Sequence, residues 1–346
     1  MKVPPRRQGL DAVSDERLRA IVLVGGLGTR LRPITYTVPK QLIPLAGQPV
    51  LYHVLDLLPR NVEEATLACG YKAEAIEAYL TAHPHRVRTR VVRESQPLGT
   101  GGAMRNAASG ASDPFFLLNG DVISGIDLTQ MLAFHREKGA FGTMSLTEVE
   151  DPQPFGVAVL DGEERITRFV EKPPRAEAPS RWINAGVTIW SREVLEQIPD
   201  RVPLSFESEV MGSVLSKGIY GFCLRSFWED AGTPAGILHA QRLLFDHPRK
   251  DRLAARSQLE GAQVLPPVAI GRGCHADGAV VGRYVTLGQE VRLGQGARVE
   301  NSILMDGVEV GPGAHILGSI VGPGQSIPPG TVLEGRCVGS TPEGVS

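Results

Sequence analysis

Three glycines followed by an arginine and a lysine form the stretch of this sequence best suited to chemistry. Gly25, Gly26 and Gly28 come directly after a short β-branched apolar run, and Arg30 and Lys40 follow them. Such an apolar run fits a buried strand of a parallel sheet. Glycines after a strand let backbone N–H groups close on an anion, and nearby cations strengthen that hold. The pattern therefore predicts a binding site for the phosphates of a nucleoside triphosphate.

Two common phosphate-binding motifs do not fit this turn. A dinucleotide fingerprint needs a third glycine where the sequence has Leu31, and a Walker A loop needs a lysine where Thr29 follows Gly28. On these residues alone, an ordinary glycine-rich turn between a strand and a helix is an alternative. The triphosphate hypothesis therefore depends on what stands elsewhere in the chain.

Acidic residues in two loops are candidate ligands for a metal ion. Asp121 ends the tripeptide Asn-Gly-Asp, and Asp230 stands within Trp-Glu-Asp-Ala-Gly-Thr-Pro, each near glycine and after an apolar run. A hard ion such as Mg²⁺ takes oxygen ligands from carboxylates and from substrate phosphates. Taken separately, each aspartate fits a turn or a helix cap better. The hypothesis that Asp121 and Asp230 bind one metal ion together is therefore supported only by the larger pattern of blocks described below.

Two further strand ends carry polar side chains. Glu171 and Lys172 follow the alternating run 165–170, and their groups suit a sugar hydroxyl and a phosphate respectively. A solvated ion pair before a turn would give the same sequence. Asn184 stands at the start of another strand-like run and alone indicates little.

These residues need a sheet whose strand ends converge. From Arg19 to about Phe245, strand-like and helix-like runs alternate, which is typical of a doubly wound, mainly parallel α/β sheet. We expect strands at 62–68, 86–92 and 115–118 and a helix at 73–82. In such sheets ligands gather beyond the carboxyl ends of the strands, where Gly25, Gly26 and Asp121 would lie.

The pattern changes after Pro248, where an apolar residue recurs about every six positions. These residues are Ile270, Ala276, Val281, Leu287, Leu293, Val299, Leu304, Val310, Ile316, Val321, Ile327 and Val332. A period near six is typical of a β-solenoid, in which each short strand stacks on the strand three hexapeptides later. A β-sandwich would space its strands at about 8–12 residues.

Composition excludes several classes of protein. The 346 residues carry a net charge of -2, which argues against a nucleic-acid coat, and 42% of them are hydrophobic. The first twenty residues lack the apolar core of a signal peptide, and no apolar run is long enough to cross a bilayer, so we expect a cytoplasmic protein. The scattered cysteines fit small buried thiols better than zinc ligands or disulfides: Cys69, Cys223, Cys274 and Cys337.

Six blocks of the sequence, taken in order, resemble those of the sugar-1-phosphate nucleotidyltransferases. The blocks are GGLGTRLRP (25–33) with Pro39-Lys40 soon after, PLGTGGA (97–103), NGDV (119–122), FVEKP (169–173), INAGV (183–187) and WEDAGTP (228–234). The tail of hexapeptides is similar to the left-handed β-helix found in several members. Six ordered blocks are far more specific than any one of them.

The resemblance implies a fold and a reaction. It implies a Rossmann-like α/β domain at 19–247, followed by a left-handed parallel β-helix at 248–346, after an N-terminal extension at 1–18. The reaction joins a nucleoside triphosphate and a sugar 1-phosphate into a nucleotide sugar and releases pyrophosphate. Because the sugar phosphate attacks the α-phosphorus in line, catalysis reduces to positioning and charge neutralisation.

The resemblance also assigns roles to residues of this sequence. Arg30 would hold the β- and γ-phosphates, Lys40 and Lys172 would cover the α-phosphate and the sugar phosphate, and Asp121 and Asp230 would hold Mg²⁺. The residues expected to bind the nucleotide are Leu23, Gly25, Gly26, Gly28, Thr29, Glu94, Pro97, Gly99, Thr100 and Gly120. Those expected to bind the sugar are Gly156, Glu171 and Asn184.

The base and the sugar are less well determined. Glu94 would accept the two adjacent donors of guanine, whereas thymine and uracil would suit a glutamine better. With the block around Glu94, the sequence resembles the mannose-1-phosphate guanylyltransferases most. The segment 35–42 is instead closer to glucose-1-phosphate thymidylyltransferases with a β-helix tail. GTP with mannose 1-phosphate is thus favoured over formation of dTDP-glucose.

Proteins with this pair of domains also include non-catalytic regulatory subunits that bind a nucleotide sugar. Loss of the cationic or acidic site residues would mark such a subunit, and here they are present. The tail could instead be an acyltransferase with His275 or His315 as its base, although turns of the coil are a better place for both. We expect the β-helix to serve in homo-oligomer formation, because its open end and flat faces invite another chain.

Overall fold

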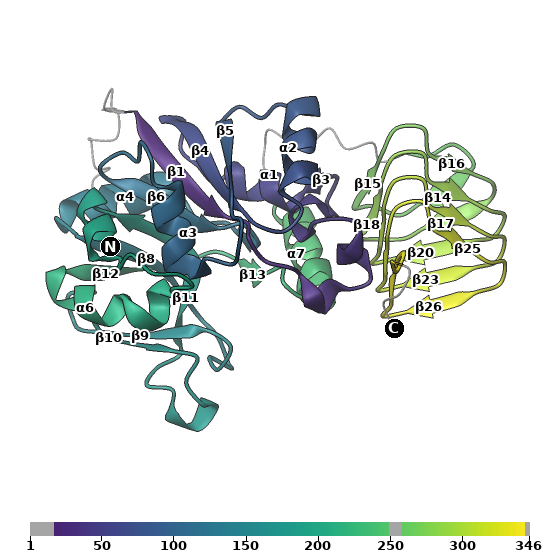
Figure 1. Ribbon diagram of the computed structural model, residues 1–346. Helices are drawn as coiled ribbons and strands as arrows, with labels where there is room; N and C mark the ends of the chain where they lie inside the picture. Colours follow the sequence, from purple (N-terminus) through teal and green to yellow (C-terminus); the bar gives the residue numbers. More distant parts are fainter. Residues whose placement is uncertain (1–16, 249–257, 343–346) are drawn as a thin grey trace, which may run out of the picture.

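The structure is a computed structural model that describes residues 17–248 and 258–342. An α/β part and a coil of short strands lie beside each other, with α7 (Pro234–Asp246) on the side that faces the coil (Figure 1). The N-terminal extension expected at 1–18 lies almost wholly outside the described residues. Within the described ranges, no helix has both the length and the apolar character needed to cross a membrane.

A nine-stranded sheet forms the centre of the α/β part, in the order β10-β9-β11-β6-β1-β4-β5, with β8 beside β11 and β12 beside β8. Its strands are β1 (Leu18–Leu23), β4 (Val62–Cys69), β5 (Arg88–Arg93), β6 (Phe115–Asn119), β8 (Gly142–Glu148), β9 (Gly156–Leu160), β10 (Ile166–Glu171), β11 (Trp182–Trp190) and β12 (Ile219–Cys223). The half from β6 to β5 is parallel, whereas β11 runs antiparallel to β6, β8 and β9. The predicted α/β fold is confirmed, and its sheet is mixed.

Helices and shorter strands surround this sheet. The α-helices are α1 (Val50–Leu55), α2 (Ala73–Ala82), α3 (Gly99–Ala107), α4 (Leu128–Glu137), α5 (Phe206–Glu209), α6 (Met211–Val214) and α7. The 3-10 helices are η1 (Thr29–Leu31), η2 (Ile34–Tyr36), η3 (Lys40–Leu42), η4 (Arg175–Glu177), η5 (Arg192–Gln197) and η6 (Leu215–Lys217). Two small ladders pair β2 (Pro44–Leu45) with β3 (Gln48–Pro49) and β7 (Val122–Ser124) with β13 (Trp228–Asp230).

Local sequence explains where two of the longer helices begin. The Asp127 carboxylate accepts hydrogen bonds from the N–H groups of Thr129 and Gln130 at the start of α4. At α7, the Thr233 hydroxyl accepts from Gly236 N–H, and Pro234 occupies the first turn. Such caps satisfy N–H groups that have no partner within the helix, and proline suits this first turn.

The coil consists of three parallel sheets, in the orders β14-β17-β20-β23-β26, β15-β18-β21-β24-β27 and β16-β19-β22-β25. Its strands are β14 (Ala262–Val264), β15 (Val268–Ile270), β16 (His275–Ala276), β17 (Ala279–Val281), β18 (Val285–Leu287), β19 (Arg292–Leu293), β20 (Arg298–Glu300), β21 (Ile303–Leu304), β22 (Glu309–Val310), β23 (His315–Leu317), β24 (Ile320–Val321), β25 (Ser326–Ile327), β26 (Val332–Glu334) and β27 (Cys337–Val338). This arrangement is consistent with the predicted left-handed β-helix.

The hexapeptide pattern predicts the interior of the coil, except at its last position. From Val281 to Ile327 every predicted apolar residue is buried. Val332 is 70% exposed, and the next residue, Leu333, packs inward and pairs with Ile316. Since successive side chains of a strand point to opposite faces, a shift of one residue reverses the assignment. The prediction for Val332 is therefore wrong.

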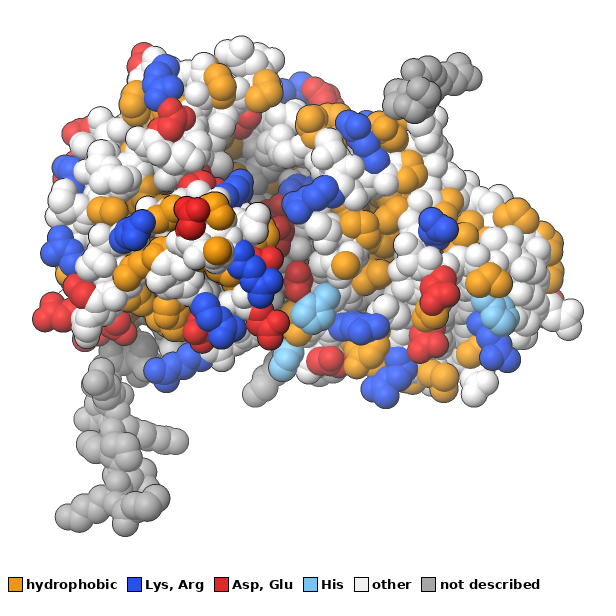
Figure 2. Space-filling view, turned by 90° about the horizontal axis from the view of Figure 1, so that it is seen from below, with side chains coloured by type: hydrophobic (Ala, Val, Ile, Leu, Met, Phe, Trp, Pro, Cys, Tyr) orange, Lys and Arg blue, Asp and Glu red, His pale blue; other side chains and the backbone are white. Residues whose placement is uncertain are grey.

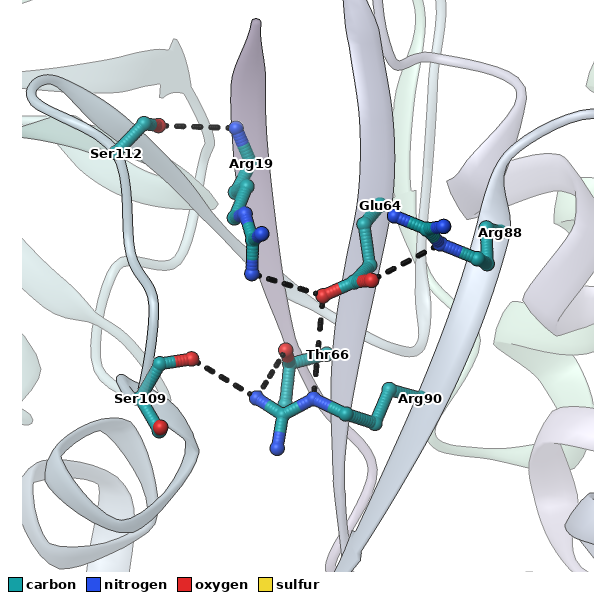
Figure 3. A network of polar contacts seen from close by, with 7 residues as sticks. All are labelled: Arg19, Glu64, Thr66, Arg88, Arg90, Ser109 and Ser112. Carbon is teal, nitrogen blue, oxygen red and sulfur yellow. Dashed lines mark hydrogen bonds and ion pairs between the residues drawn. The ribbon is translucent and has the colours of Figure 1, made fainter.

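The edge of the sheet at β5 is charged. Glu64 on β4 lies 3.0 Å from Arg19 Nη1 on β1 and 3.0 Å from Arg88 Nε on β5 (Figure 3). Arg90 on β5 also lies near Glu64 and donates to the Thr66 hydroxyl at 3.0 Å. Charged side chains on an edge strand discourage another strand from pairing with it. Elsewhere, acidic and basic side chains are interspersed over the face seen in Figure 2.

Of the cysteines predicted to be buried thiols, Cys69 is buried, whereas Cys223, Cys274 and Cys337 are only partly buried. All four lie in the described part of the chain and are free thiols, and Cys69 is fully buried. Burial raises the pKa of Cys69 to about 12 and also raises the pKa of Cys223, Cys274 and Cys337. Thiols of this kind are poor nucleophiles at neutral pH.

Candidate active site

The glycine-rich turn leaves the carboxyl end of β1 and is held by Thr35. Gly28 has a φ of 62°, a backbone conformation that residues with a side chain rarely adopt. In addition, a Cβ at this position would stand only 2.9 Å from Thr35 Cγ2, so both backbone and space favour glycine. The Thr35 hydroxyl donates to the Gly28 carbonyl at 2.8 Å, and the Tyr71 hydroxyl donates to the Thr35 carbonyl at 2.8 Å. The protein itself therefore fixes the shape of the turn.

The turn opens into a pocket of about 320 Å³. The pocket is lined by Leu23, Gly25, Gly26, Lys40, Gln41, Glu94, Pro97, Leu98, Gly99, Thr100, Ala103, Asn119 and Asp121. Seven of the ten residues predicted to bind the nucleotide are among them. Gly28, Thr29 and Gly120 are not part of this lining, although Gly120 N–H donates to the Leu23 carbonyl at 2.9 Å. A larger cavity of about 1000 Å³, around His53 and Phe227, is lined by none of the predicted residues.

Glu94 presents a buried acceptor to this pocket. Its Oε1 is buried and has no hydrogen-bond partner among the described residues, while Leu98 N–H donates to the carboxylate. Burial raises the pKa of the Glu94 carboxyl, and the bond from Leu98 opposes that rise. A buried acceptor without a partner costs about 1–3 kcal/mol. A ligand that carries a hydrogen-bond donor would remove this cost.

The loop before α3 is joined to a distant segment. Gly99 has a φ of 73°, and a Cβ there would stand 2.4 Å from the Leu204 carbonyl oxygen. That carbonyl accepts from Gly101 N–H at 2.9 Å, and Leu204 N–H donates to the Leu98 carbonyl at 2.8 Å. The Thr100 hydroxyl donates to the Glu207 carboxylate. One side of the pocket is therefore fixed by residues about a hundred positions further along the chain.

The predicted metal ligands lie side by side, each with a cation. Ala231 N–H donates to the Asp121 carbonyl at 2.9 Å, which brings the two loops together. The Lys40 ammonium donates to the Asp121 carboxylate, and Arg30 Nη2 lies 3.9 Å from Asp230 Oδ2. Burial raises the pKa of Asp230 and the charge of Asp121 raises it further, against the opposing effect of Lys40 and Arg30.

This pair of carboxylates fits a divalent cation. Two carboxylates that repel each other are stabilised by a shared positive charge, and hard divalent ions prefer oxygen ligands. No group of three or more His, Cys, Asp or Glu side chains suited to a metal occurs in the described part of the chain. Asp121 and Asp230 would therefore share the ion with oxygens of the substrates.

The predicted sugar-binding residues form a second group. A Cβ on Gly156 would stand 2.7 Å from Glu171 Oε2, and Lys172 Nζ lies 3.3 Å from Glu171 Oε1. Burial raises the pKa of Glu171, as does the charge of Glu207, while Lys172 lowers it. Asn184 lines a narrow crevice with Glu207. This crevice shares two residues of its lining with the nucleotide pocket, Leu23 and Asn119.

Two predicted cations lie outside the lining of the nucleotide pocket. The side chain of Arg30 is 62% exposed, and that of Lys172 is 65% exposed. Only Lys40, at 13%, is enclosed by the pocket. Lys40 is therefore placed before substrate binds, whereas Arg30 and Lys172 have room to reorient toward a ligand.

Three residues at the site were missed by the sequence reasoning. Gln41 is 1% exposed and lines the nucleotide pocket, and Asn119 contributes to both the pocket and the crevice. Gln41 directly follows the block that ends in Lys40, and Asn119 is the first residue of the block NGDV, so their position was a usable signal. Glu207 accepts a hydrogen bond from the Thr100 hydroxyl, and its charge raises the pKa of Glu171. The sequence around Glu207 gives no local sign of these two interactions.

Family models match both parts of the chain. The family model described as "Nucleotidyl transferase" matches residues 19–247, and "GMPPB C-terminal domain" matches 264–342. The mannose-1-phosphate guanylyltransferase of Mycobacterium tuberculosis is 35% identical, over 86% of this chain and 82% of the relative. The mannose-1-phosphate guanylyltransferase catalytic subunit beta of Danio rerio is 37% identical, over 74% of each chain.

Solved structures share the fold over about two thirds of this chain. HddC from Yersinia pseudotuberculosis, complexed with GMP-PN, has a TM-score of 0.56 and 26% identity, covering 65% of this chain and 98% of that one. A UDP-glucose pyrophosphorylase complexed with UDP-glucose has a TM-score of 0.60 at 20% identity, covering 67% of this chain and all of that one. With a family match over well over half of its length and relatives above 30% identity, this chain belongs to the nucleotidyl transferase family.

Proposed function

We propose that this protein transfers a guanylyl group from GTP to mannose 1-phosphate, giving GDP-mannose and pyrophosphate. The observation that carries the choice of base is the buried Oε1 of Glu94, which lacks a partner among the described residues. Guanine presents two adjacent N–H donors on its Watson–Crick edge, and a carboxylate accepts both. The Watson–Crick edges of uracil and thymine would bring carbonyl oxygens toward the same carboxylate, which repels them.

The phosphates would lie beside Gly26, where a Cβ would stand 3.5 Å from Lys40 Nζ, whereas a Cβ on Gly25 would stand 3.3 Å from Glu94 Oε2. Lys40 would cover the α-phosphate, and Arg30 would hold the β- and γ-phosphates as pyrophosphate departs. Lys172, beside Glu171, would hold the phosphate of the sugar. The phosphate oxygen of the sugar then attacks the α-phosphorus, and the bond to pyrophosphate breaks. No side chain has to act as nucleophile, so the described groups bind, orient and neutralise charge.

We propose Mg²⁺ as the ion held by Asp121 and Asp230. Bound there, it would supply positive charge to phosphate oxygens as the pyrophosphate leaves. The two relatives named above support the choice of GTP and mannose 1-phosphate, because both carry that activity in their names.

Pyrophosphate release tests the proposal directly. The purified protein is incubated with Mg²⁺ and each of GTP, dTTP, UTP and ATP, against mannose 1-phosphate and glucose 1-phosphate. We expect the highest kcat/KM with GTP and mannose 1-phosphate. Preference for dTTP with glucose 1-phosphate would establish the alternative, thymidylyltransferase, reading. Binding of a nucleotide sugar without turnover of any pair would identify a regulatory subunit instead.

We also propose that the protein forms a homo-oligomer through the β-helix. At its C-terminal coil, Val332 is 70% exposed and Leu317 is 43% exposed, both on the outer face of one sheet. β26 and β27 are the last strands of their sheets, so the described coil ends in open edges. Apolar side chains beside an open edge favour contact with a second copy of the chain.

A further inference from the structure

Ile34 of the α/β part packs against two glycines of the β-helix. A Cβ added to Gly322 would stand 3.2 Å from Ile34 Cδ1. A Cβ added to Gly339 would stand 3.3 Å from the Ile34 backbone nitrogen and 3.4 Å from its Cα. Ile34 itself is fully buried. The last described turns of the β-helix therefore touch η2 directly, and a side chain at either glycine would require Ile34 to shift by a few tenths of an ångström.

This contact belongs to a hydrophobic cluster shared by both parts of the molecule. From the α/β part it includes Leu31, Ile34, Ile43 and Leu45, and from the β-helix it includes Ile303, Met305 and Ile320. Leu31 directly follows Arg30, and Ile43 lies three residues after Lys40. Ala231, the neighbour of Asp230, is in the same cluster. Three residues predicted to bind phosphates or metal thus stand on chain segments that the β-helix helps to bury.

A short path joins Ile34 to the glycine-rich turn. Thr35 follows Ile34, and its hydroxyl donates to the Gly28 carbonyl at 2.8 Å. The same carbonyl accepts from Leu31 N–H at 2.9 Å, which closes η1 around Arg30. A displacement of Ile34 would therefore move the Thr35 hydroxyl, the donor that holds the Gly28 carbonyl and with it the turn. Movement of about 1 Å at a reacting group costs roughly a hundredfold in rate.

Polar contacts fix α7 to the β-helix as well. Gln241 is fully buried, donates to the Tyr284 carbonyl at 2.8 Å and accepts from the Thr286 hydroxyl at 2.6 Å. Arg242 Nε donates to Asn301 Oδ1 at 2.7 Å. A buried and satisfied amide of this kind is expensive to separate from its partners. The two parts of the molecule are joined in one packed arrangement.

We propose that the β-helix is a positioning element of the nucleotidyl transfer site, acting through Ile34 on the Gly28–Arg30 turn. Ile34 is a positioning residue, because it touches the β-helix and the turn but no reacting atom. The inference rests on the proposed function only for its rate measurements. It gives the β-helix a role in turnover that is separate from assembly.

The β-helix contains two glycines, Gly322 and Gly282, that form a matched pair for the test. A Cβ at Gly322 would meet Ile34 Cδ1 and the carbonyl oxygen of Val338, each at 3.2 Å. The three atoms nearest to a Cβ at Gly282 all belong to the β-helix: the carbonyl oxygen of Val299 and Cβ and Cγ of Glu300, each at 3.2 Å. Gly322→Ala and Gly282→Ala therefore crowd the coil in similar ways, and only the first crowds Ile34.

We expect Gly322→Ala to lower kcat several-fold, with the KM of the sugar phosphate unchanged, and Gly282→Ala to leave both near wild type. Ile34→Val removes Cδ1, the atom that the new methyl group meets, so it should restore most of the kcat lost in Gly322→Ala. Such a rescue measures coupling between the two sites. Equal kcat values for Gly322→Ala and Gly282→Ala, or a double variant that shows no rescue, would overturn the proposal.

A second measurement needs no turnover. Coupling between sites is reciprocal, so GTP with Mg²⁺ should slow hydrogen exchange in the β-helix around residues 320–322 and 337–339. The slowing should be smaller in Gly322→Ala and return in the double variant with Ile34→Val. Exchange in these coils that is indifferent to GTP would contradict the inference, whether or not the protein turns over mannose 1-phosphate. Failure of the proposed function would instead appear as wild-type protein without pyrophosphate release.

Discussion

The ammonium of Lys40 donates a hydrogen bond to the carboxylate of Asp121. Both groups are needed elsewhere during the proposed reaction, Lys40 on the α-phosphate and Asp121 on the metal ion. The pair holds the Lys40 side chain in place until a ligand replaces each partner. Binding of the metal and of the triphosphate should therefore be cooperative, because each releases the group that the other needs.

Replacement of Asp121 should change the metal requirement. In Asp121→Asn we expect the Mg²⁺ concentration at half-maximal rate to rise at least tenfold, since even residues that only orient a metal ligand are worth about 10–100-fold in affinity. Asp127→Asn is the control, because Asp127 caps α4 and does not line the nucleotide pocket. It should lower thermal stability slightly and leave the Mg²⁺ titration unchanged. An unchanged titration in Asp121→Asn would remove this residue from the metal site.

Loss of Arg30 should slow the chemical step. Removing one preorganised charge stabiliser typically costs about 100–1000-fold in kcat, and Arg30→Ala should fall in that range. Arg32→Ala is a matched control, because the Arg32 guanidinium is exposed and stacks on Tyr36 at 4.8 Å. Steady-state pyrophosphate release measures both. A near-normal kcat for Arg30→Ala would end its assignment to the triphosphate.

Glu94→Gln should raise the unfolding temperature of the protein and weaken its binding of GTP. The amide buries no charge, so we expect the unliganded variant to unfold at a higher temperature than wild type at neutral pH. Its KM for GTP should rise roughly tenfold or more, because one acceptor of a charged hydrogen bond is replaced by a donor. Glu74→Gln, at an exposed position on α2, should change neither quantity. A GTP preference that survives Glu94→Gln would move base recognition away from Glu94.

The same residue predicts a pH dependence. Burial raises the pKa of Glu94, so the carboxylate gains its proton at a higher pH than an ordinary glutamate. The KM for GTP of the wild type should therefore rise as the pH falls into the acidic range, and that of Glu94→Gln should not. Identical pH profiles of KM in the two proteins would show that Glu94 does not meet the base.

His135 should make the α/β part sensitive to acid. The side chain is 5% exposed, bonds the Thr143 hydroxyl at 2.8 Å, and has its pKa lowered by burial from 6.5 to about 4. The folded state therefore binds fewer protons than the unfolded state between these values, and stability is lost as pH falls below 6.5. By pH 5 the loss should reach about 1–2 kcal/mol. In His135→Gln, urea unfolding at pH 7 and pH 5 should differ by less than in wild type.

Self-association should respond to a charge on the last coil. Val332→Glu adds a carboxylate to an exposed position and removes apolar contact area, so we expect a smaller oligomer by light scattering at matched concentration. Val202→Glu is the control, because Val202 is also exposed, at 46%, but lies in the α/β part. An oligomer unaffected by Val332→Glu would place the contact on another surface.

Local patterns predicted the parts of the fold that depend on neighbours in sequence. The helix at 73–82 and the apolar interior of the coil follow from periodicity, and they are confirmed. The antiparallel half of the sheet was missed, because β11 pairs with β6, β8 and β9 through contacts that no local pattern encodes. The error at Val332 has a similar cause: Val332 and Leu333 are both apolar, and pairing of Leu333 with Ile316 on β23 decides which of them points inward.

The residues of the site also fall into those that local sequence predicts and those that it does not. Residues such as Gly28, Lys40 and Asp121 stand in short blocks whose order and composition point to phosphate chemistry. Glu207 and Ile34 owe their importance to partners far away in sequence, Thr100 for the first and Gly322 for the second. Nothing in the local sequence distinguishes them from an ordinary surface acid or core isoleucine.

The hydrophobic cluster around Ile34 can form only after residues far apart in the sequence have all been synthesised. Ile34 leaves the ribosome well before its partners Ile303, Met305 and Ile320, which lie about 270 to 290 residues further along the chain. At synthesis rates of about 5–20 residues per second, this interval is on the order of 15–60 s. During that time an apolar surface beside the future active site has no cover. The nascent protein should need a chaperone at this stage, and the enzyme should become active only once its final coils have folded.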